Sequence, residues 1–432
     1  MTTHVLRRFS AIAGLSCLII CGQAGPGAGQ DRVPDQGMNS PATFYVIDLL
    51  SRANAAWEDE RCDDAADLYR QAFLIDASIK RIAYRLGWCY NQQRRYPEAV
   101  WVLKEAVRLT PDDEMVRSEL AFSLRNMTRF DEALAAYGDL LSINPQSAEA
   151  RFQIGWIHNE RGEYREAIES LQDALRLAPD RADAYQDLGY AYRNTKRFDE
   201  AVQAYSTAAK LEPKDPAPLK SLGDLYFELK QHNNAAAAYT RVVTLDPSNA
   251  HVYRRLGWSL NELARFEEAI APLKMALQLD RQDIDAYREI GYAWRKLGQC
   301  DLAIAAYTEL MRLDAHSEVP HFGLADVYFD LNNYSQAIDQ YRAGLQLGRG
   351  NVSVLLNLGA AYEALGNNDE ALSAYQRAVQ LDPKSAEAHL TLGLLWIKRG
   401  ESRLAETEAE ILKTSAPEKA QELLSKILPF GK

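Results

Sequence analysis

The sequence is dominated by one short pattern that returns every 34 residues, ten times over, between Lys80 and Lys419. Each copy carries a glycine or alanine and, twelve residues later, a second alanine, with no insertion to interrupt the count. The first of these positions holds Gly87, Ala121, Gly155, Gly189, Gly223, Gly257, Gly291, Ala325, Gly359 and Gly393. The second holds Ala99, Ala133, Ala167, Ala201, Ala235, Ala269, Ala303, Ala337, Ala371 and Ala405. A period of this length indicates one supersecondary unit stacked on copies of itself.

One copy shows what the unit is. Apolar residues follow helical spacing from Ala182 to Asn194 and again from Lys196 to Leu211, which predicts two amphipathic helices. The polar stretch between them is short, as a tight antiparallel hairpin requires. We expect Gly189 and Ala201 where the two helices cross. A glycine inside a helix costs about 1 kcal/mol relative to alanine, which close packing must offset.

The same copy carries an aromatic residue, a leucine–glycine pair, a tyrosine, an alanine, a second tyrosine and a closing proline. These are Tyr185, Leu188, Gly189, Tyr192, Ala201, Tyr205 and Pro213. The pattern and its length resemble the tetratricopeptide repeat (TPR), and the resemblance covers residues 80–419. It implies an all-α fold, a right-handed α-solenoid of stacked antiparallel helix pairs (a TPR superhelix) with a C-terminal capping helix. It also implies a concave groove lined by the first helix of every repeat.

The segments that flank the ten repeats read as caps and a linker. Residues 46–79 keep the 34-residue frame weakly, which predicts a degenerate TPR-like repeat that serves as the N-terminal cap. Residues 418–432 contain an apolar stripe at helical spacing, which predicts a C-terminal capping helix and a short tail. Residues 25–45 are rich in Gly, Pro, Gln and Asp, a composition typical of a disordered linker.

Residues 1–24 are expected to be a signal peptide. Arg7 and Arg8 form a charged region without acidic residues, and an apolar run that is too short to span a membrane follows from Ala11 to Cys21. We therefore expect export to the periplasm or outer envelope. Two variants stay open: Cys21 ends a segment like a lipobox, although Ile20 stands where a small residue is usual, and the arginine pair weakly resembles a twin-arginine signal.

No catalytic or cofactor-binding motif stands out. The seven histidines have no zinc spacing with a cysteine, and phosphate-binding loops, nucleophile elbows and dinucleotide fingerprints are missing. We expect no enzyme activity, no metal and no cofactor. The net charge of −11 disfavours binding to nucleic acid. Three cysteines follow the signal peptide, and Cys62 and Cys89 are either a disulfide pair or two buried thiols.

A longer period is present on the first helices. In TPR solenoids the residue after the glycine position and the one three further on project into the groove, and from the third repeat these pairs read Trp/Asn, Tyr/Arg, Asp/Phe and then repeat. Three repeats, or 102 residues, therefore form a higher unit. The candidate groove residues are Trp88, Asn91, Phe122, Arg125, Trp156, Asn159, Tyr190, Arg193, Asp224, Phe227, Trp258, Asn261, Tyr292, Arg295, Asp326 and Phe329.

These residues allow two interpretations. A duplicated block keeps its residues whether or not they bind anything, and the aromatic rings can simply pack against neighbouring helices. Alternatively, Trp and Tyr supply contact area, Asn hydrogen-bonds a peptide backbone and Arg pairs with a carboxylate, as at binding hot spots. The groove would then hold an extended peptide or a glycan. We expect a non-enzymatic scaffold that binds a partner protein. The alternatives are a TPR subunit that binds or guides an exopolysaccharide during export, and an enzyme or a chaperone-like regulator of one.

Overall fold

The computed structural model of the chain describes residues 41–348 and 350–427, and all regular structure in these ranges is helical. The predicted signal peptide with Cys21, most of the predicted linker and the C-terminal tail lie outside the described residues. The helices are α2 (Pro41–Glu58), α3 (Cys62–Ile75), α4 (Lys80–Gln92), α5 (Tyr96–Leu109), α6 (Glu114–Asn126), α7 (Phe130–Ile143), α8 (Ala148–Arg161), α9 (Tyr164–Leu177), α10 (Ala182–Asn194), α11 (Phe198–Leu211), α12 (Pro216–Glu228), α13 (His232–Leu245), α14 (Ala250–Glu262), α15 (Phe266–Leu279), α16 (Ile284–Lys296), α17 (Cys300–Leu313), α18 (Val319–Asp330), α19 (Tyr334–Leu347), α20 (Val352–Ala364), α21 (Asn368–Leu381), α22 (Ala386–Lys398), α23 (Ser402–Ser415) and α24 (Pro417–Ile427).

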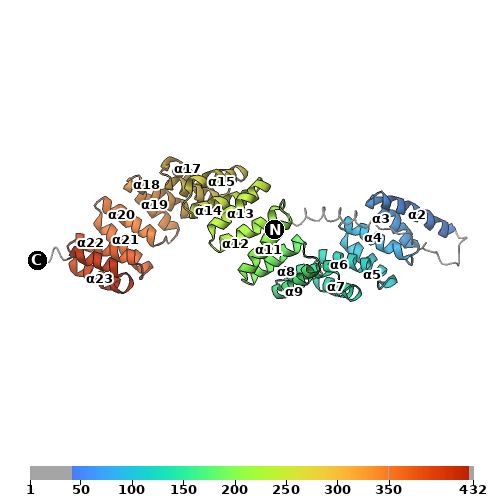
Figure 1. The fold of residues 1–432 in the computed structure, drawn as a ribbon. Coiled ribbons are helices and arrows are strands. Elements are labelled where there is room, and N and C mark those ends of the chain that lie inside the picture. Colours follow the sequence, from blue (N-terminus) through green and yellow to red (C-terminus); the bar gives the residue numbers. More distant parts are fainter. Residues whose placement is uncertain (1–40, 349, 428–432) are drawn as a thin grey trace. The chain divides into compact units, whose positions relative to one another are not determined.

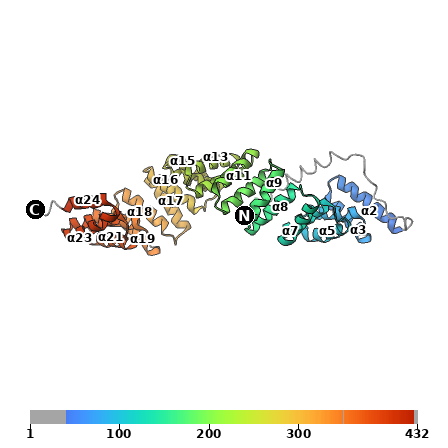
Figure 2. The same cartoon turned by 60° about the horizontal axis from the view of Figure 1, so that its bottom comes forward.

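The helices form antiparallel pairs that follow one another in chain order (Figures 1 and 2). The chain divides into two compact units between Ala150 and Arg151. The first contains the cap repeat α2–α3 and the pairs α4–α5 and α6–α7. The second unit begins within α8 and contains all helices from there to α24. This is the all-α solenoid of stacked helix pairs that the repeat pattern predicts.

The repeat pattern also places the helix ends well. The pair α10 and α11 begins and ends within two residues of the ranges predicted from sequence. Polar side chains cap several first helices: the Asp113 carboxylate accepts hydrogen bonds from the backbone N–H groups of Met115 and Val116, and Asp215 does the same for Ala217. Such caps satisfy donors that a helix N-terminus leaves without partners.

Each hairpin turns on one residue with left-handed backbone geometry. These residues recur every 34 positions, and four of the eleven are glycines. They are Glu60, Arg94, Thr128, Gly162, Lys196, Lys230, Ala264, Gly298, Asn332, Gly366 and Gly400. Because side chains with a Cβ are strained in this region, most notably the β-branched Thr128 at φ 58°, the fold imposes the turn on the sequence in the other seven copies.

The small residues lie where the two helices of a repeat meet, as predicted. A Cβ added to Gly189 would come within 2.7 Å of Cδ1 in the Tyr205 ring. Ala201 has no exposed surface, and Tyr205 keeps only 1% of its own. In the last repeat the aromatic position holds the small Ala409, and Leu423 of α24 packs over Gly393 instead. The predicted capping helix is therefore present, in contact with α22 and α23.

The start of the cap repeat differs from the prediction. Helix α2 begins at Pro41, so residues 41–45, which we assigned to the linker, are helical. Proline is favoured in the first turn of a helix because its missing N–H would have no partner there. The prediction of a linker that extends to residue 45 is therefore wrong.

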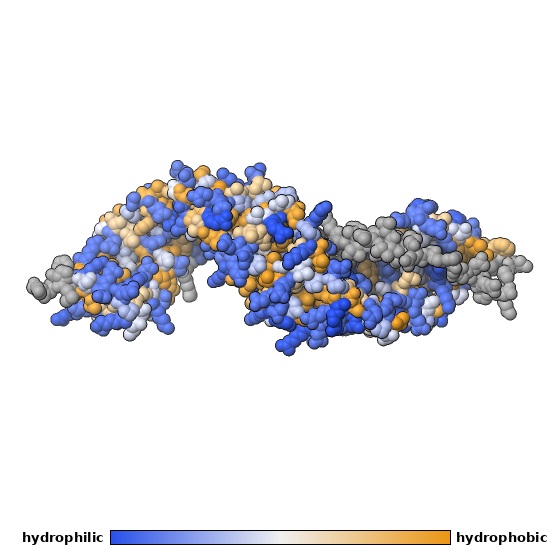
Figure 3. All heavy atoms as spheres, viewed as in Figure 1, coloured by the Kyte–Doolittle hydropathy of each residue, from blue (hydrophilic) through white to orange (hydrophobic). Residues whose placement is uncertain are grey.

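The first helices lie on the inner side of the stack. Neighbouring first helices touch each other directly, as α4 touches α6 and α14 touches α16, whereas successive second helices in the described residues make no comparable contact. Hydrophobic residues reach the surface as separate patches among hydrophilic ones on the face that Figure 3 shows. Within residues 41–348 and 350–427, no helix is long and apolar enough to cross a membrane.

Candidate functional site

The candidate groove residues all lie on first helices, and they differ in exposure. Buried are Asn91, Arg125, Asn159 and Asn261. Partly buried are Trp88, Phe122, Trp156, Arg193, Asp224, Phe227, Trp258, Arg295, Asp326 and Phe329. The most exposed members are Tyr190 at 44% and Tyr292 at 36%.

The three asparagines join successive first helices. The Asn91 amide nitrogen donates to the backbone oxygen of Glu119 at 3.2 Å and to its carboxylate at 2.7 Å. Asn261 makes the same two bonds to Glu289, at 2.9 and 3.1 Å, and Asn159 donates to the backbone oxygen of Asp187 at 3.0 Å. Each bond spans 28 residues, from one repeat to the next. This corrects the expectation that the asparagines project into the groove, because their amides hold the stack together.

The three junctions differ at the asparagine side-chain oxygen. The Asn91 oxygen accepts a hydrogen bond from the Ser123 hydroxyl at 2.6 Å. The position of Ser123 is held by Ala191 and Ala293 in the other two junctions, and the buried side-chain oxygens of Asn159 and Asn261 have no hydrogen-bond donor among the described residues. Two of the three junctions thus contain an unsatisfied buried acceptor, which costs stability.

Burial also changes the acidic members of these junctions. Loss of solvent raises the pKa of the Glu119 carboxyl to about 7, although its hydrogen bond from Asn91 opposes the rise. Desolvation likewise raises the pKa of Glu289, against its bonds from Asn261 and Arg288. These carboxyls serve the packing of successive first helices, and their neighbours account for them without any catalytic role.

The aromatic residues pack edge to face on rings of adjacent helices. Trp258 lies 4.8 Å from Phe227 of the preceding first helix, between ring centroids. Tyr190 and Tyr292 meet Tyr164 and Phe266, which begin the preceding second helices, at 6.0 and 5.8 Å. The same arrangement joins Phe122 to Tyr96, and Trp88 contacts Trp57 of the cap repeat at 4.6 Å. The rings therefore pack laterally, while Tyr190 and Tyr292 keep a substantial exposed surface.

Two arginines lie against the contact between Phe227 and Trp258. The Arg255 guanidinium lies 4.4 Å from the Phe227 ring centroid and 5.7 Å from that of Trp258, and Arg288 lies 5.4 Å from Trp258. We call Phe227, Arg255, Trp258 and Arg288 the Trp258 cluster. It draws on three consecutive first helices, α12, α14 and α16, and it combines aromatic surface with cations.

The candidate arginines and aspartates are paired within the inner face. Arg193 binds the Glu228 carboxylate at 2.8 Å, and Arg295 binds both Asp326 and Asp330 at 2.6 Å. Asp224 accepts from the Tyr239 hydroxyl at 2.8 Å and pairs with Lys220. Arg125 is buried over the Phe122 ring. A ligand carboxylate would therefore compete with carboxylates of this chain for Arg193 and Arg295.

A third row on the inner face, two residues before the glycine position, is absent from the candidate groove residues predicted from sequence. Arg85 of this row stacks on Trp57 at 5.2 Å and donates to the Tyr69 hydroxyl at 2.8 Å, and Arg255 holds the same place in the Trp258 cluster. Trp57 was missed as well, although the repeat frame extends into the cap. Arg85 and Arg255 belong to this third row, and Trp57 holds the position of Asn91 in the cap repeat. Reading these two rows in every repeat, the cap included, would have found all three residues.

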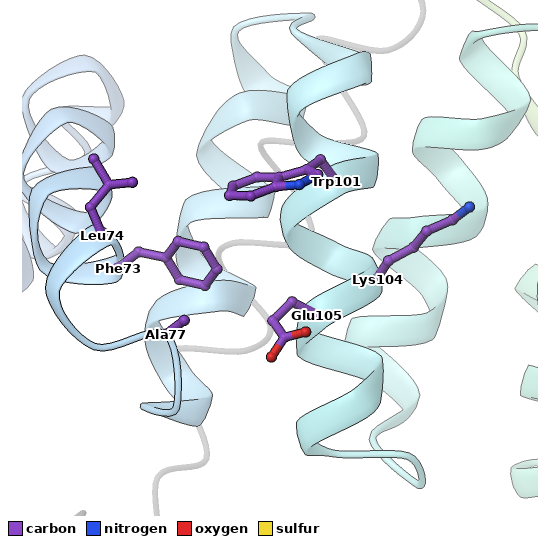
Figure 4. Close-up of a pocket in the computed structure, with 6 residues that line it drawn as sticks. All are labelled: Phe73, Leu74, Ala77, Trp101, Lys104 and Glu105. Carbon is purple, nitrogen blue, oxygen red and sulfur yellow. The ribbon is translucent and has the colours of Figure 1, made fainter.

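A separate cavity of about 500 Å³ lies on the outer side of the first unit (Figure 4). Phe73 and Leu74 of α3 and Trp101 of α5 line it, with Lys104 and Glu105 beside the tryptophan. Trp101 is 63% exposed and Leu74 70%, and no other repeat has a large apolar side chain at either position. In the part of the chain that the structure describes, no group of acidic, histidine or cysteine side chains could hold a metal ion.

Comparisons with known proteins agree with this geometry. The family model of the Cilia and flagella-associated protein 70 C-terminal domain matches residues 116–351, and a tetratricopeptide repeat model matches residues 50–114, 322–386 and 356–418. Comparison with curated proteins gives no match.

Among solved structures, the C-terminal part of a TPR repeat-containing protein from Cytophaga hutchinsonii has 19% identity and a TM-score of 0.50, with 56% of this chain and 99% of that chain covered. The APC/C hetero-tetramer Cut9–Hcn1 has 16% identity and a TM-score of 0.46, with 90% and 97% covered. A tetratricopeptide repeat protein from Parabacteroides merdae has 18% identity and a TM-score of 0.43, with 58% and 99% covered. The Cytophaga similarity supports the fold, and the family models support the repeat. The chain belongs to the tetratricopeptide-repeat family.

Proposed function

We propose that this chain is a non-enzymatic scaffold of the cell envelope that binds an extended segment of a partner protein along its inner face. The observation that carries the proposal is the aromatic row on consecutive first helices, with Tyr190 and Tyr292 exposed and the Trp258 cluster between them in sequence. Repeats stack at a regular spacing, and Tyr190 and Tyr292 hold the same position three repeats apart, so the row offers similar contacts at every third repeat. An extended chain matches that regularity better than a compact ligand does.

The chemistry of the row favours a peptide as the ligand. Tyrosine and tryptophan combine large contact area with few rotatable bonds and a polar group that hydrogen-bonds a backbone. Lateral edge-to-face packing covers part of each ring, which leaves less open ring face than stacking on a sugar requires. A polysaccharide remains the alternative ligand that the test includes.

The test starts from peptides selected by display on the purified chain, with a glycan array run in parallel. The double variant Tyr190→Ala/Tyr292→Ala should weaken binding of a selected peptide at least about tenfold, because both side chains are exposed and central to the row. The matched control is Gln203→Ala/Ala305→Ser, two exposed positions on second helices of the same repeats. Equal loss in both variants, or saturable glycan binding that the tyrosine variant abolishes, would overturn the peptide proposal.

The envelope location rests on the composition of residues 1–24 and needs its own measurement. Mass spectrometry of the native protein should show a chain that begins close to Gly25. A chain that begins at a lipid-modified Cys21 would indicate a lipoprotein instead. A native chain that still begins at Met1 would remove the envelope from the proposal and leave the scaffold.

A further inference from the structure

Two of the cysteines lie together at the junction between the cap repeat and the first complete repeat. Cys62 is the first residue of α3, and Cys89 lies in the last turns of α4. The two helices pack against each other, and the two thiol groups are hydrogen-bonded to one another. Cys300 belongs to the other unit, on α17.

The surrounding contacts hold the two thiols in place. The Gln93 side chain, at the end of α4, donates to the carboxylate of Asp63 at 2.9 Å. Asp63 is the neighbour of Cys62, so this bond fixes the start of α3 beside the end of α4. Cys89 has no exposed surface, whereas Cys62 is partly exposed. Cys62 is therefore the residue that an external reagent can reach, whereas Cys89 is shielded from solvent.

We propose that Cys62 and Cys89 are a modification site that forms a disulfide in exchange with a small-molecule disulfide or an oxidised protein dithiol. The Cys62 sulfur attacks the external disulfide, forms a mixed disulfide and releases one external thiol. The Cys89 sulfur then attacks the Cys62 sulfur, and the second external thiol leaves. Both cysteines are oxidised, the external disulfide is reduced to two thiols, and these carry away the two protons.

The order of the two steps follows from burial. Desolvation strongly raises the pKa of the Cys89 thiol, and the adjacent Cys62 sulfur raises it further, so Cys89 is a poor first nucleophile. Once the mixed disulfide has formed on Cys62, Cys89 is already in contact with the sulfur that it must attack. Contact of this kind, rather than high reactivity, is what makes the second step fast.

The disulfide would attach the cap repeat to the first complete repeat. The cap departs most from the repeat pattern, and the bond would close a loop of about 28 residues that includes all of α3, which restricts the unfolded chain. The proposal does not depend on the ligand of the inner face, so the two succeed or fail separately.

The experiment incubates the folded chain, residues 25–432, with oxidised glutathione, blocks remaining thiols and identifies the cysteines by mass spectrometry after digestion. We expect a linked pair of peptides containing Cys62 and Cys89, about 2 Da lighter than their sum because two hydrogens are lost. Cys300 should stay outside the pair. The linked chain should unfold at least about 5 °C higher than the reduced chain, and dithiothreitol should reverse the shift. Cys300→Ser should change neither result.

Two variants separate the disulfide from general reactivity. Cys89→Ala should stop the reaction at the Cys62–glutathione mixed disulfide, and Cys62→Ser should leave Cys89 unmodified because it is buried. Stable glutathione on Cys62 of the unaltered chain would overturn the proposal. The proposal would also be overturned if, after incubation with oxidised glutathione, Cys62 and Cys89 were both found as free thiols that the blocking reagent had modified separately.

Discussion

The unsatisfied asparagine oxygens give the most discriminating prediction. Ala191 and Ala293 occupy the position of Ser123, and the hydroxyl of Ser123 donates to the Asn91 oxygen at 2.6 Å. We therefore expect that Ala191→Ser and Ala293→Ser supply the missing donor to Asn159 and Asn261. Serine in place of a buried helical alanine normally lowers stability, so a gain would be diagnostic.

The expected magnitude follows from the atoms involved. A hydrogen bond adds about 0.5–1.5 kcal/mol, relief of a buried unpaired acceptor adds more, and serine costs about 0.5 kcal/mol in helix propensity. Each substitution should therefore raise the free energy of unfolding by about 0.5–2 kcal/mol. The reverse change, Ser123→Ala, should lower it by a similar amount, because the buried Asn91 oxygen loses its donor.

The chain contains a matched control at the same repeat position. Ala361 is equally buried, but the preceding repeat has Phe329 in place of asparagine, so a serine there finds no acceptor across the junction. Ala361→Ser should lower the free energy of unfolding by about 1 kcal/mol. Urea unfolding followed by circular dichroism measures the total, and hydrogen exchange in α10, α16 and α20 assigns it to a repeat. Equal changes at Ala191 and Ala361 would refute the reasoning.

Three further predictions concern stability. Burial raises the pKa of Glu119 from 4.5 to about 7, so the fold favours the neutral carboxyl. The stability that this contributes, up to roughly 3 kcal/mol, is complete below about pH 4.5 and is lost as the pH rises through 7. Glu119→Gln should remove that loss in denaturant titrations at pH 5 and pH 8, and an unchanged difference between the two pH values would contradict the assignment. A Cβ added to Gly138 would meet no neighbouring group within 4 Å, so Gly138→Ala should raise the free energy of unfolding by about 0.5–1 kcal/mol. Gly189→Val should lower it by about 2 kcal/mol or more, because Tyr205 occupies the space. Thermal unfolding that ranks the two variants in the opposite order would contradict the packing described. Thr128 and Gly366 hold the same turn position, with φ values of 58° and 81°. Thr128→Gly should therefore raise the free energy of unfolding by about 1 kcal/mol, and Gly366→Thr should lower it by a similar amount. A loss of stability in both variants would contradict the turn geometry.

Much of the fold could be predicted because every repeat has the same spacing of apolar and small residues. The spacing of apolar residues defines α10 and α11 almost to the residue, and the apolar stripe after Pro417 indicates α24. The left-handed turn was not predictable, because only four of its eleven residues are glycine. The packing of the two helices can hold Thr128 or Lys196 in that geometry. Neither residue type favours a positive φ, so the sequence at these positions does not indicate the left-handed turn.

The candidate site was harder to predict, since sequence periodicity gives the helix face but not the contacts on that face. Trp258 and Tyr292 lie on first helices as expected. Asn261 lies on the same face, yet its amide bonds to Glu289 of the next repeat, and that choice depends on the distance between successive helices. Arg255 was overlooked for the related reason that its position holds glutamate, glutamine, aspartate or serine in neighbouring repeats. The position of a residue within the repeat therefore predicts the helix face on which its side chain lies better than it predicts which groups that side chain contacts.

The claim that the inner face binds an extended partner segment can be tested directly by photo-crosslinking. A photoreactive phenylalanine analogue placed at Tyr190 or Tyr292 would face a bound peptide, whereas the same analogue at Gln203 or Ala305 would face away from it. The account predicts ultraviolet-dependent crosslinks to a display-selected peptide from the two tyrosine positions, at different residues along the peptide. Crosslinks mainly from Gln203 and Ala305, or to a single peptide residue from both tyrosine positions, would contradict it.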